Sequence, residues 1–174
     1  MRKWESLRPW VQEQHLRPES YANHRQEFCG HPARLTVFKN FLQRTVAEQL
    51  SCFLDTEAEF QIVYGLYSHE GSGISAEEWL TAAEKDQFFR FSRIAGVPPQ
   101  LRLSPNAFTF LRFRKALQDD IFTEFFGSLT GLPLRWSNNF ASHALKAGDF
   151  LKVHDDNGKE RQLAVLSGSP TSTA

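Results

Sequence analysis

The sequence predicts an α+β fold, with helices concentrated before residue 134 and strands after it. Two patterns lead to this prediction. Apolar residues recur at helical spacing through residues 104–130, whereas they alternate with polar residues in the segments between 134 and 166. Hydrophobic residues make up 41% of the 174, so one domain with a substantial core is expected. The 16 Phe favour an interior filled with aromatic rings.

The N-terminal segment, residues 1–33, is polar and contains only a sparse apolar set. Pro18 suits the first turn of a short helix, because the N–H that proline lacks has no helical partner there. Three histidines in this segment lack the spacing of a metal site and are expected at the surface: His15, His24 and His31.

The following segments predict a strand, a helix and a second strand. Residues 34–39 alternate and contain β-branched and aromatic side chains, which favours a strand. Apolar residues at helical spacing predict a helix over about 43–54. Residues 60–66 alternate cleanly, which predicts a strand with one buried face.

Three further helices are predicted from their end signals. Ser75 and Glu78 have the spacing of a capping box, and the Phe88–Phe89 pair extends the apolar content of that helical region toward residue 96. Ser104 before Pro105 starts the next helix, and Asp119 or Asp120 restarts it. Gly127, Gly131 and Pro133 end this helical part.

A β-hairpin is predicted near the end of the chain. Its strands are residues 150–153 and 161–166, and Asn157-Gly158 is a strong hairpin-turn signal because both residues tolerate positive φ. His154, Asp155 and Asp156 lie at this turn. The spacing of His154 and Asp156 offers a metal one imidazole and one carboxylate from adjacent backbone positions.

Composition argues against several classes of function. Lys+Arg and Asp+Glu both number 20, so no basic excess favours nucleic acid or an anionic membrane as a partner. No run approaches the roughly 18 apolar residues of a membrane helix. Cys29 and Cys52 are too few for a disulfide framework, so two reduced thiols and a cytoplasmic location are expected.

The hairpin region resembles the iron-binding hairpin of Fe(II)/2-oxoglutarate-dependent dioxygenases, in their prolyl-hydroxylase-like branch. The resemblance is carried by Gly148-Asp-Phe-Leu-Lys-Val-His-Asp-Asp156 and by the strand Arg161-Gln-Leu-Ala-Val-Leu166. Residues 35–42 resemble the family's opening strand and helix, and residues 125–133 resemble the helix end before its jelly roll. The similarity covers roughly residues 34–166.

This resemblance implies N-terminal helices packed on a double-stranded β-helix, or jelly roll, that binds Fe(II) and 2-oxoglutarate. Its chemistry is oxidative decarboxylation of 2-oxoglutarate coupled to hydroxylation of a C–H bond, in a small-molecule or protein substrate that the sequence does not identify. His154 is implied as the first histidine ligand and Asp156 as the carboxylate ligand. Asp155 is expected to point away, and Asp149 and Arg161 to frame the hairpin.

The family takes its second histidine, and the basic residue that binds 2-oxoglutarate, from later strands. The 18 residues after Asp156, 157–174, contain no His, and Lys159 and Arg161 are their only basic residues. A C-terminally truncated member is therefore expected, with residues 34–166 as the first part of the domain. His143 is a candidate for the third ligand.

Two expectations follow for the last part of the chain. Residues 167–174 are low in apolar content and are expected to be disordered. An incomplete jelly roll exposes a sheet edge, which favours self-association. The alternative hypothesis is a non-catalytic interaction module in which the acidic turn is only a hairpin tip.

Overall fold

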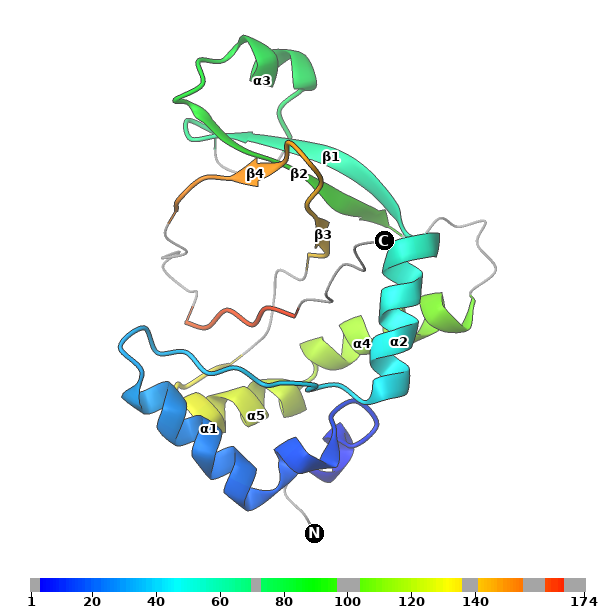
Figure 1. Cartoon of the computed structure of the whole chain (residues 1–174), viewed down its shortest axis with the longest axis vertical. Coiled ribbons are helices and arrows are strands. Elements are labelled where there is room, and N and C mark those ends of the chain that lie inside the picture. The colour runs from blue at the N-terminus through cyan, green and yellow to red at the C-terminus, as the bar shows by residue number, and fades with distance from the viewer. Residues whose placement is uncertain (1–3, 70–72, 97–103, 136–140, 155–161, 168–174) are drawn as a thin grey trace. The chain divides into compact units, whose positions relative to one another are not determined.

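The described residues form helices and one antiparallel sheet, which confirms the predicted α+β class, but the two long strands, Glu59–Leu66 and Gln87–Gly96, lie before residue 134 and not after it (Figure 1). The computed structural model describes residues 4–69, 73–96, 104–135, 141–154 and 162–167. A helical unit comprises Met1–Glu57, Arg102–Asn139 and Gln162–Ala174, and a sheet unit comprises Ala58–Leu101 and Phe140–Arg161.

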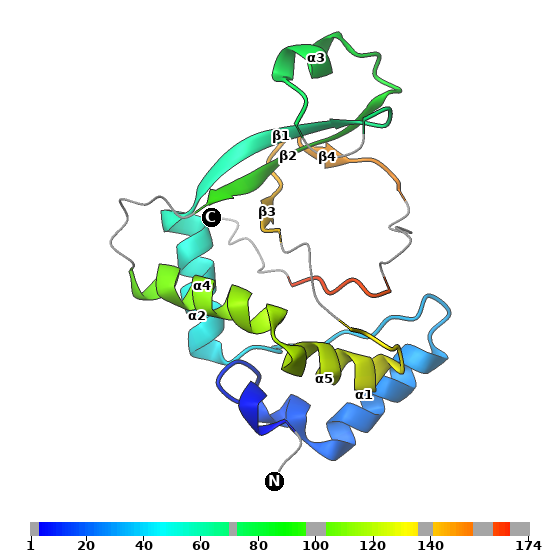
Figure 2. The same ribbon diagram turned by 180° about the vertical axis from the view of Figure 1, so that it is seen from behind.

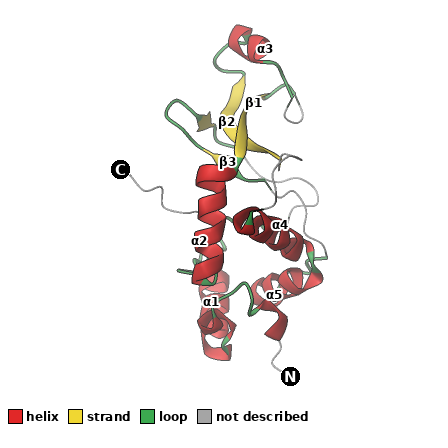
Figure 3. Ribbon diagram, turned by 90° about the vertical axis from the view of Figure 1, so that its right-hand side faces the viewer, coloured by secondary structure: helices red, strands yellow, loops and turns green. Residues whose placement is uncertain are grey.

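The helices of the helical unit, drawn red in Figure 3, begin and end close to the predicted signals. Pro18 is the first residue of its helix, and the Ser104 hydroxyl accepts a hydrogen bond from the Ala107 N–H at 2.9 Å. Gly131, with φ of 77°, ends the last helix in the left-handed conformation. The helices are α1 Pro18–Gly30, α2 Arg44–Cys52, α4 Pro105–Gln118 and α5 Asp120–Thr130, with 3-10 turns at Glu5–Leu7 and Glu13–Leu16 and a π-helical turn at Phe53–Glu57.

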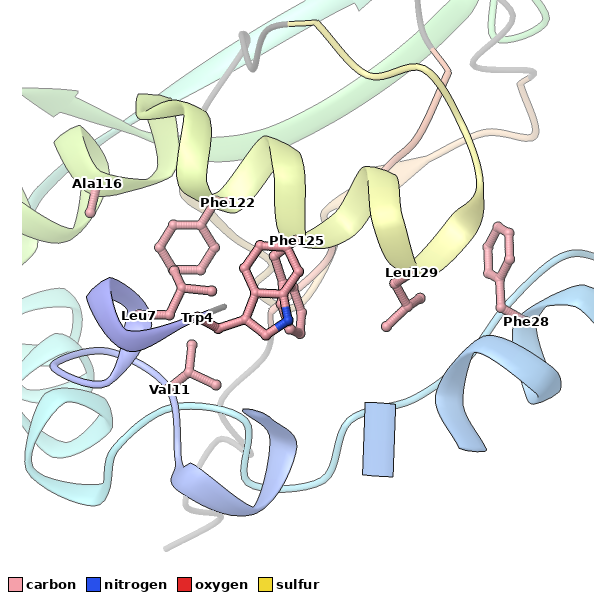
Figure 4. Close-up of a cluster of buried hydrophobic side chains, with 8 residues drawn as sticks. All are labelled: Trp4, Leu7, Val11, Phe28, Ala116, Phe122, Phe125 and Leu129. Atoms are coloured by element: carbon pink, nitrogen blue, oxygen red, sulfur yellow. The ribbon is translucent and has the colours of Figure 1, made fainter. Parts of the chain in front are cut away.

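The core of the helical unit lies between α5 and the N-terminal segment (Figure 4). Phe125 is fully buried and meets the Trp4 ring edge-on, with 5.4 Å between the ring centroids. Such edge-to-face contacts between buried rings stabilise beyond the burial of their area. The buried cluster comprises Trp4, Leu7, Val11, Phe28, Ala116, Phe122, Phe125 and Leu129.

The strand predicted over residues 34–39 is wrong, because this segment is a loop that docks onto the helices. Arg34 has φ of 50°, which interrupts an extended chain. Phe38 packs against the ring of His24 at 3.9 Å and against Phe41 at 5.1 Å, so its apolar side chain is partly buried without a sheet.

The surface position predicted for His15 is also wrong. His15 is only 5% exposed, and its Nε2–H donates to the Lys39 carbonyl at 3.0 Å. The Asn40 carbonyl lies 3.3 Å from the same nitrogen, at a turn where Asn40 adopts φ of 53°. His15 therefore satisfies backbone carbonyls of the docked loop.

The sheet unit is organised around β2, which pairs with strands on both of its edges (Figure 2). β1, Glu59–Leu66, is the predicted strand and runs antiparallel to β2, Gln87–Gly96. On the other edge lie β3, His143–Ala144, and β4, Phe150–Leu151. None of the helices in the described ranges has the length and apolar character required of a membrane span.

The helix predicted from Ser75 onward is shorter than expected. The capping box is present, since the Ser75 hydroxyl accepts from the Glu78 N–H and the Glu78 carboxylate accepts from the Ser75 N–H. However, α3 spans only Ala76–Thr81, and Phe88 and Phe89 lie in β2. The prediction was wrong there because the alternation of Phe89 and Phe91 with polar residues is a strand pattern.

The predicted hairpin of residues 150–153 with 161–166 is not formed by the described residues. β4 pairs with β2, through Phe89 opposite Leu151 and Arg90 opposite Phe150. Residues 162–167 contain no strand, and Leu163 packs against the buried cluster of the helical unit. The predicted turn, with Asn157 and Gly158, lies outside the described residues, as does the predicted disordered tail from residue 168 onward.

Candidate functional site

His154 lies three residues beyond the end of β4, and the chain leading to it is held on both sides. The Lys152 N–H donates to the Phe88 carbonyl at 3.0 Å, which extends the pairing with β2 past Leu151. The Tyr67 hydroxyl donates to the Val153 carbonyl at 3.2 Å. The His154 ring then meets the Phe88 ring edge-on at 5.4 Å. Both the backbone and the ring of the predicted ligand are therefore positioned by neighbours in the sheet unit.

The hydrogen bond of the His154 ring determines which nitrogen suits a metal. Nδ1 lies 3.0 Å from the Lys152 carbonyl oxygen. Because a carbonyl only accepts, Nδ1 carries the proton in this contact, and Nε2 is the nitrogen with the lone pair. Metal-binding histidines commonly donate their other ring N–H to a backbone carbonyl in this way.

The carboxylate predicted as the second ligand, Asp156, lies outside the described residues, together with Asp155, Lys159 and Arg161. The described part of the chain therefore contributes one donor, His154, to the predicted iron site. An imidazole is one of the ligand types that such a site uses.

His143, the candidate third ligand, lies on β3 opposite Arg93. Its ring packs on the Phe91 ring at 4.4 Å. Burial lowers the pKa of His143, and the positive charge of Arg93 lowers this pKa further. A neutral imidazole at neutral pH is the form that binds metal.

The structure does not bring His143 and His154 together. Arg93, opposite His143, is four residues along β2 from Phe89, which lies opposite Leu151. At about 3.3 Å per residue these positions are roughly 13 Å apart, and His154 lies beyond Leu151. Within the described ranges, no three His, Cys, Asp or Glu side chains are grouped so as to hold a metal ion.

A series of aromatic rings separates the two histidines, and the sequence analysis missed it. The Phe88 and Phe89 rings lie 5.2 Å apart, and Phe89 stacks on Phe91 at 4.7 Å. Tyr67 stacks on Phe88 at 4.7 Å. The alternation of Phe89 and Phe91 indicates this series in the sequence, but the adjacent Phe88 interrupts the alternation and made the segment resemble a helix.

Asp149 lies in the loop between β3 and β4. Its side chain is only 4% exposed, and the Arg90 guanidinium lies 3.7 Å from it. The Lys146 N–H donates to the same carboxylate at 2.9 Å.

Comparisons of the chain with protein-family models, curated proteins and solved structures find no match.

Proposed function

We propose that the chain is a member of the Fe(II)/2-oxoglutarate-dependent dioxygenase family, in its prolyl-hydroxylase-like branch, with His154 and Asp156 as iron ligands. The observation that carries this proposal is the 3.0 Å hydrogen bond from His154 Nδ1 to the Lys152 carbonyl, which directs Nε2 to the role of ligand. The one-residue spacing to Asp156 then supplies a carboxylate beside the imidazole.

On this proposal, the strands β1 to β4 are part of a jelly roll. A bound iron would supply hydroxylation of a C–H bond, with O₂ as the oxidant and 2-oxoglutarate as the co-substrate that leaves as succinate and CO₂. The chain's own residues hold the metal at the end of β4 and orient the His154 ring against Phe88. The substrate is a small molecule or a protein.

Cobalt(II) titration tests the metal site, because Co(II) occupies N/O sites of this kind and its absorption reports coordination. We expect saturable binding by the full chain, weakened at least about tenfold in His154→Ala and in Asp156→Asn. Asp155→Asn is the matched control, since it removes an equal charge from the neighbouring position and is expected to leave the affinity unchanged. His31→Ala is a control for loss of an imidazole from the helical unit.

Two results would contradict the metal site. One is the absence of binding by the parent chain, and the other is equal affinity in Asp155→Asn and Asp156→Asn. His143→Ala addresses the third ligand. Because His143 and His154 lie beside distant positions of β2, we expect this substitution to leave Co(II) affinity within about twofold of the parent.

A non-catalytic interaction module is the second candidate. The separation of His143 from His154 favours it, as does the exposure of apolar side chains beside β4, where Leu151 is 48% and Val153 95% exposed. This candidate predicts no Co(II) binding that depends on His154 and Asp156, so the same titration distinguishes the two.

A further inference from the structure

The strand that leads to His154, β4, is reached through an unusual loop. β3 and β4 pair with the same edge of β2, where Ala144 lies opposite Ser92 and Phe150 opposite Arg90. On β2, a single residue, Phe91, lies between the two paired positions. In the segment that joins β3 to β4, residues 145–149 lie between their partners. The loop is therefore a large bulge between two short paired segments.

This bulge leaves the register of β4 poorly determined by β3. β4 consists of two residues, Phe150 and Leu151, so its own pairing with β2 is short. A slip by one residue would turn every side chain of the strand to the opposite face of the sheet. His154 would then lose its present position. The Lys152-to-Phe88 hydrogen bond holds the register on the side of β4 that leads to His154, and a contact on the side of the bulge would hold it at the other end.

Arg90 makes that contact at the point where the bulge enters β4. Its Nη1 donates to the Gly148 carbonyl at 3.1 Å and lies 3.7 Å from the Asp149 carboxylate. Gly148 has φ of 84°, and a Cβ there would lie 3.3 Å from this same Nη1. The loop closes on itself through the Asp149 N–H, which donates to the Lys146 carbonyl at 2.9 Å. One guanidinium thus holds two adjacent groups of the bulge.

We propose that Arg90 is a positioning residue for His154: by holding Gly148 and Asp149, it fixes the register of β4 on β2. The importance of His154 rests on the proposed function, but the effect of Arg90 on register does not. Asp149 adds to the effect, since a nearly buried carboxylate strongly favours keeping its cationic partner.

A disulfide reports the register directly. Phe89 and Leu151 are opposite each other, and the Lys152-to-Phe88 hydrogen bond makes them a non-hydrogen-bonded pair, the closer kind. In a chain with Cys29→Ser and Cys52→Ser, we expect Phe89→Cys with Leu151→Cys to cross-link efficiently. Phe89→Cys with Lys152→Cys should not, because adjacent residues of a strand face opposite sides.

Arg90→Met removes the guanidinium and keeps an unbranched apolar stem. We expect it to reduce the 89–151 cross-link severalfold and to raise the 89–152 cross-link. Arg93→Met, the same substitution three residues along β2, should leave both yields at the parental level. An 89–151 yield in Arg90→Met equal to that of the parent would overturn the proposal, whatever happens to metal binding.

Metal binding provides the second readout. Without the disulfide, we expect Arg90→Met to weaken Co(II) binding about 10- to 100-fold. Forming the 89–151 disulfide in Arg90→Met should restore the Co(II) affinity. If Arg90→Met is unfolded when reduced, the disulfide should restore the fold. A disulfide that forms but restores neither would overturn the proposal. If the parent shows no His154-dependent Co(II) binding, the proposed function fails, and the cross-linking yields and fold rescue still decide the role of Arg90.

Discussion

Substitution of Gly65 tests the packing of the sheet that carries the candidate site. Gly65 lies opposite Phe89, whose ring covers the glycine. A Cβ at residue 65 would lie 2.2 Å from Cε1 of that ring and 2.5 Å from Cζ. These distances are far inside van der Waals contact, so either the ring or β1 must move.

Two opposing effects determine the magnitude for Gly65→Ala. Replacing a strand glycine with alanine stabilises by about 0.5–1 kcal/mol through lost backbone freedom in the unfolded chain. Overpacking costs about 1–3 kcal/mol, and the stacking of Phe89 on Phe91 restricts the movement of the ring. We therefore expect a net loss of about 1–2 kcal/mol in the free energy of unfolding.

A double-mutant cycle separates these effects. In a Phe89→Ala background the clash is absent, so Gly65→Ala should become neutral or stabilising. Urea unfolding of the four proteins, followed by circular dichroism, measures the coupling. Gly30→Ala is the control, because open space surrounds Gly30 in α1. An equal loss from Gly65→Ala with and without Phe89 would refute the clash as the cause.

Three further predictions concern the helical core, pH and the sheet edge. Phe125→Ala should lower the free energy of unfolding by about 3–5 kcal/mol in urea titrations, and a loss below about 1 kcal/mol would contradict its place in the core. Burial and the neighbouring His15 lower the pKa of His24 below 6.5, so the unfolded chain takes up this proton first as the pH falls. Stability should therefore decrease as the pH falls below about 6.5, and His24→Asn should flatten this dependence in thermal melts; an unchanged slope would exclude His24 as its source. β1 pairs only with β2 among the described strands, so we expect self-association through its other edge in sedimentation velocity. Ile62→Lys should reduce it, whereas Leu80→Lys on α3 should not, and equal effects would argue against that edge.

The helix ends were predicted well, because the residues that signal a helix end in the sequence also make the local contacts that form it. Ser75 and Ser104 form the predicted caps, and Pro18 begins the predicted helix. These features depend on residues within one turn of each other, so tertiary context has little influence on them. The strand predicted over residues 60–66 is present as β1, but its predicted buried face is not, since Ile62 is 47% exposed and Gly65 is buried.

The wrong predictions involve segments whose apolar residues contact distant parts of the chain. Phe38 alternates as in a strand, yet it is partly buried against His24 and Phe125, so residues 34–39 need no strand partner. Leu163 packs on the helical core, which the hairpin signal at Asn157 could not indicate. Tertiary burial overrides short-range pattern in both cases.

The candidate site was predictable only in part. The spacing of His154 and Asp156 is visible in the sequence, but the hydrogen bond from the His154 ring to Lys152 depends on the path of the chain after β4. The contact of Arg90 with the 145–149 bulge was not predictable, because it joins residues 58 positions apart in the chain.

The central claim is that His154 and Asp156 bind one metal ion, and histidine-resolved NMR during a Co(II) titration tests it most directly. The chain has six histidines, so each imidazole can be followed separately. We predict that the His154 resonances shift or broaden first, at low metal concentration, and that Asp156→Asn abolishes this response while Asp155→Asn preserves it. A response that begins at another histidine, or that is the same in both variants, would contradict the claim.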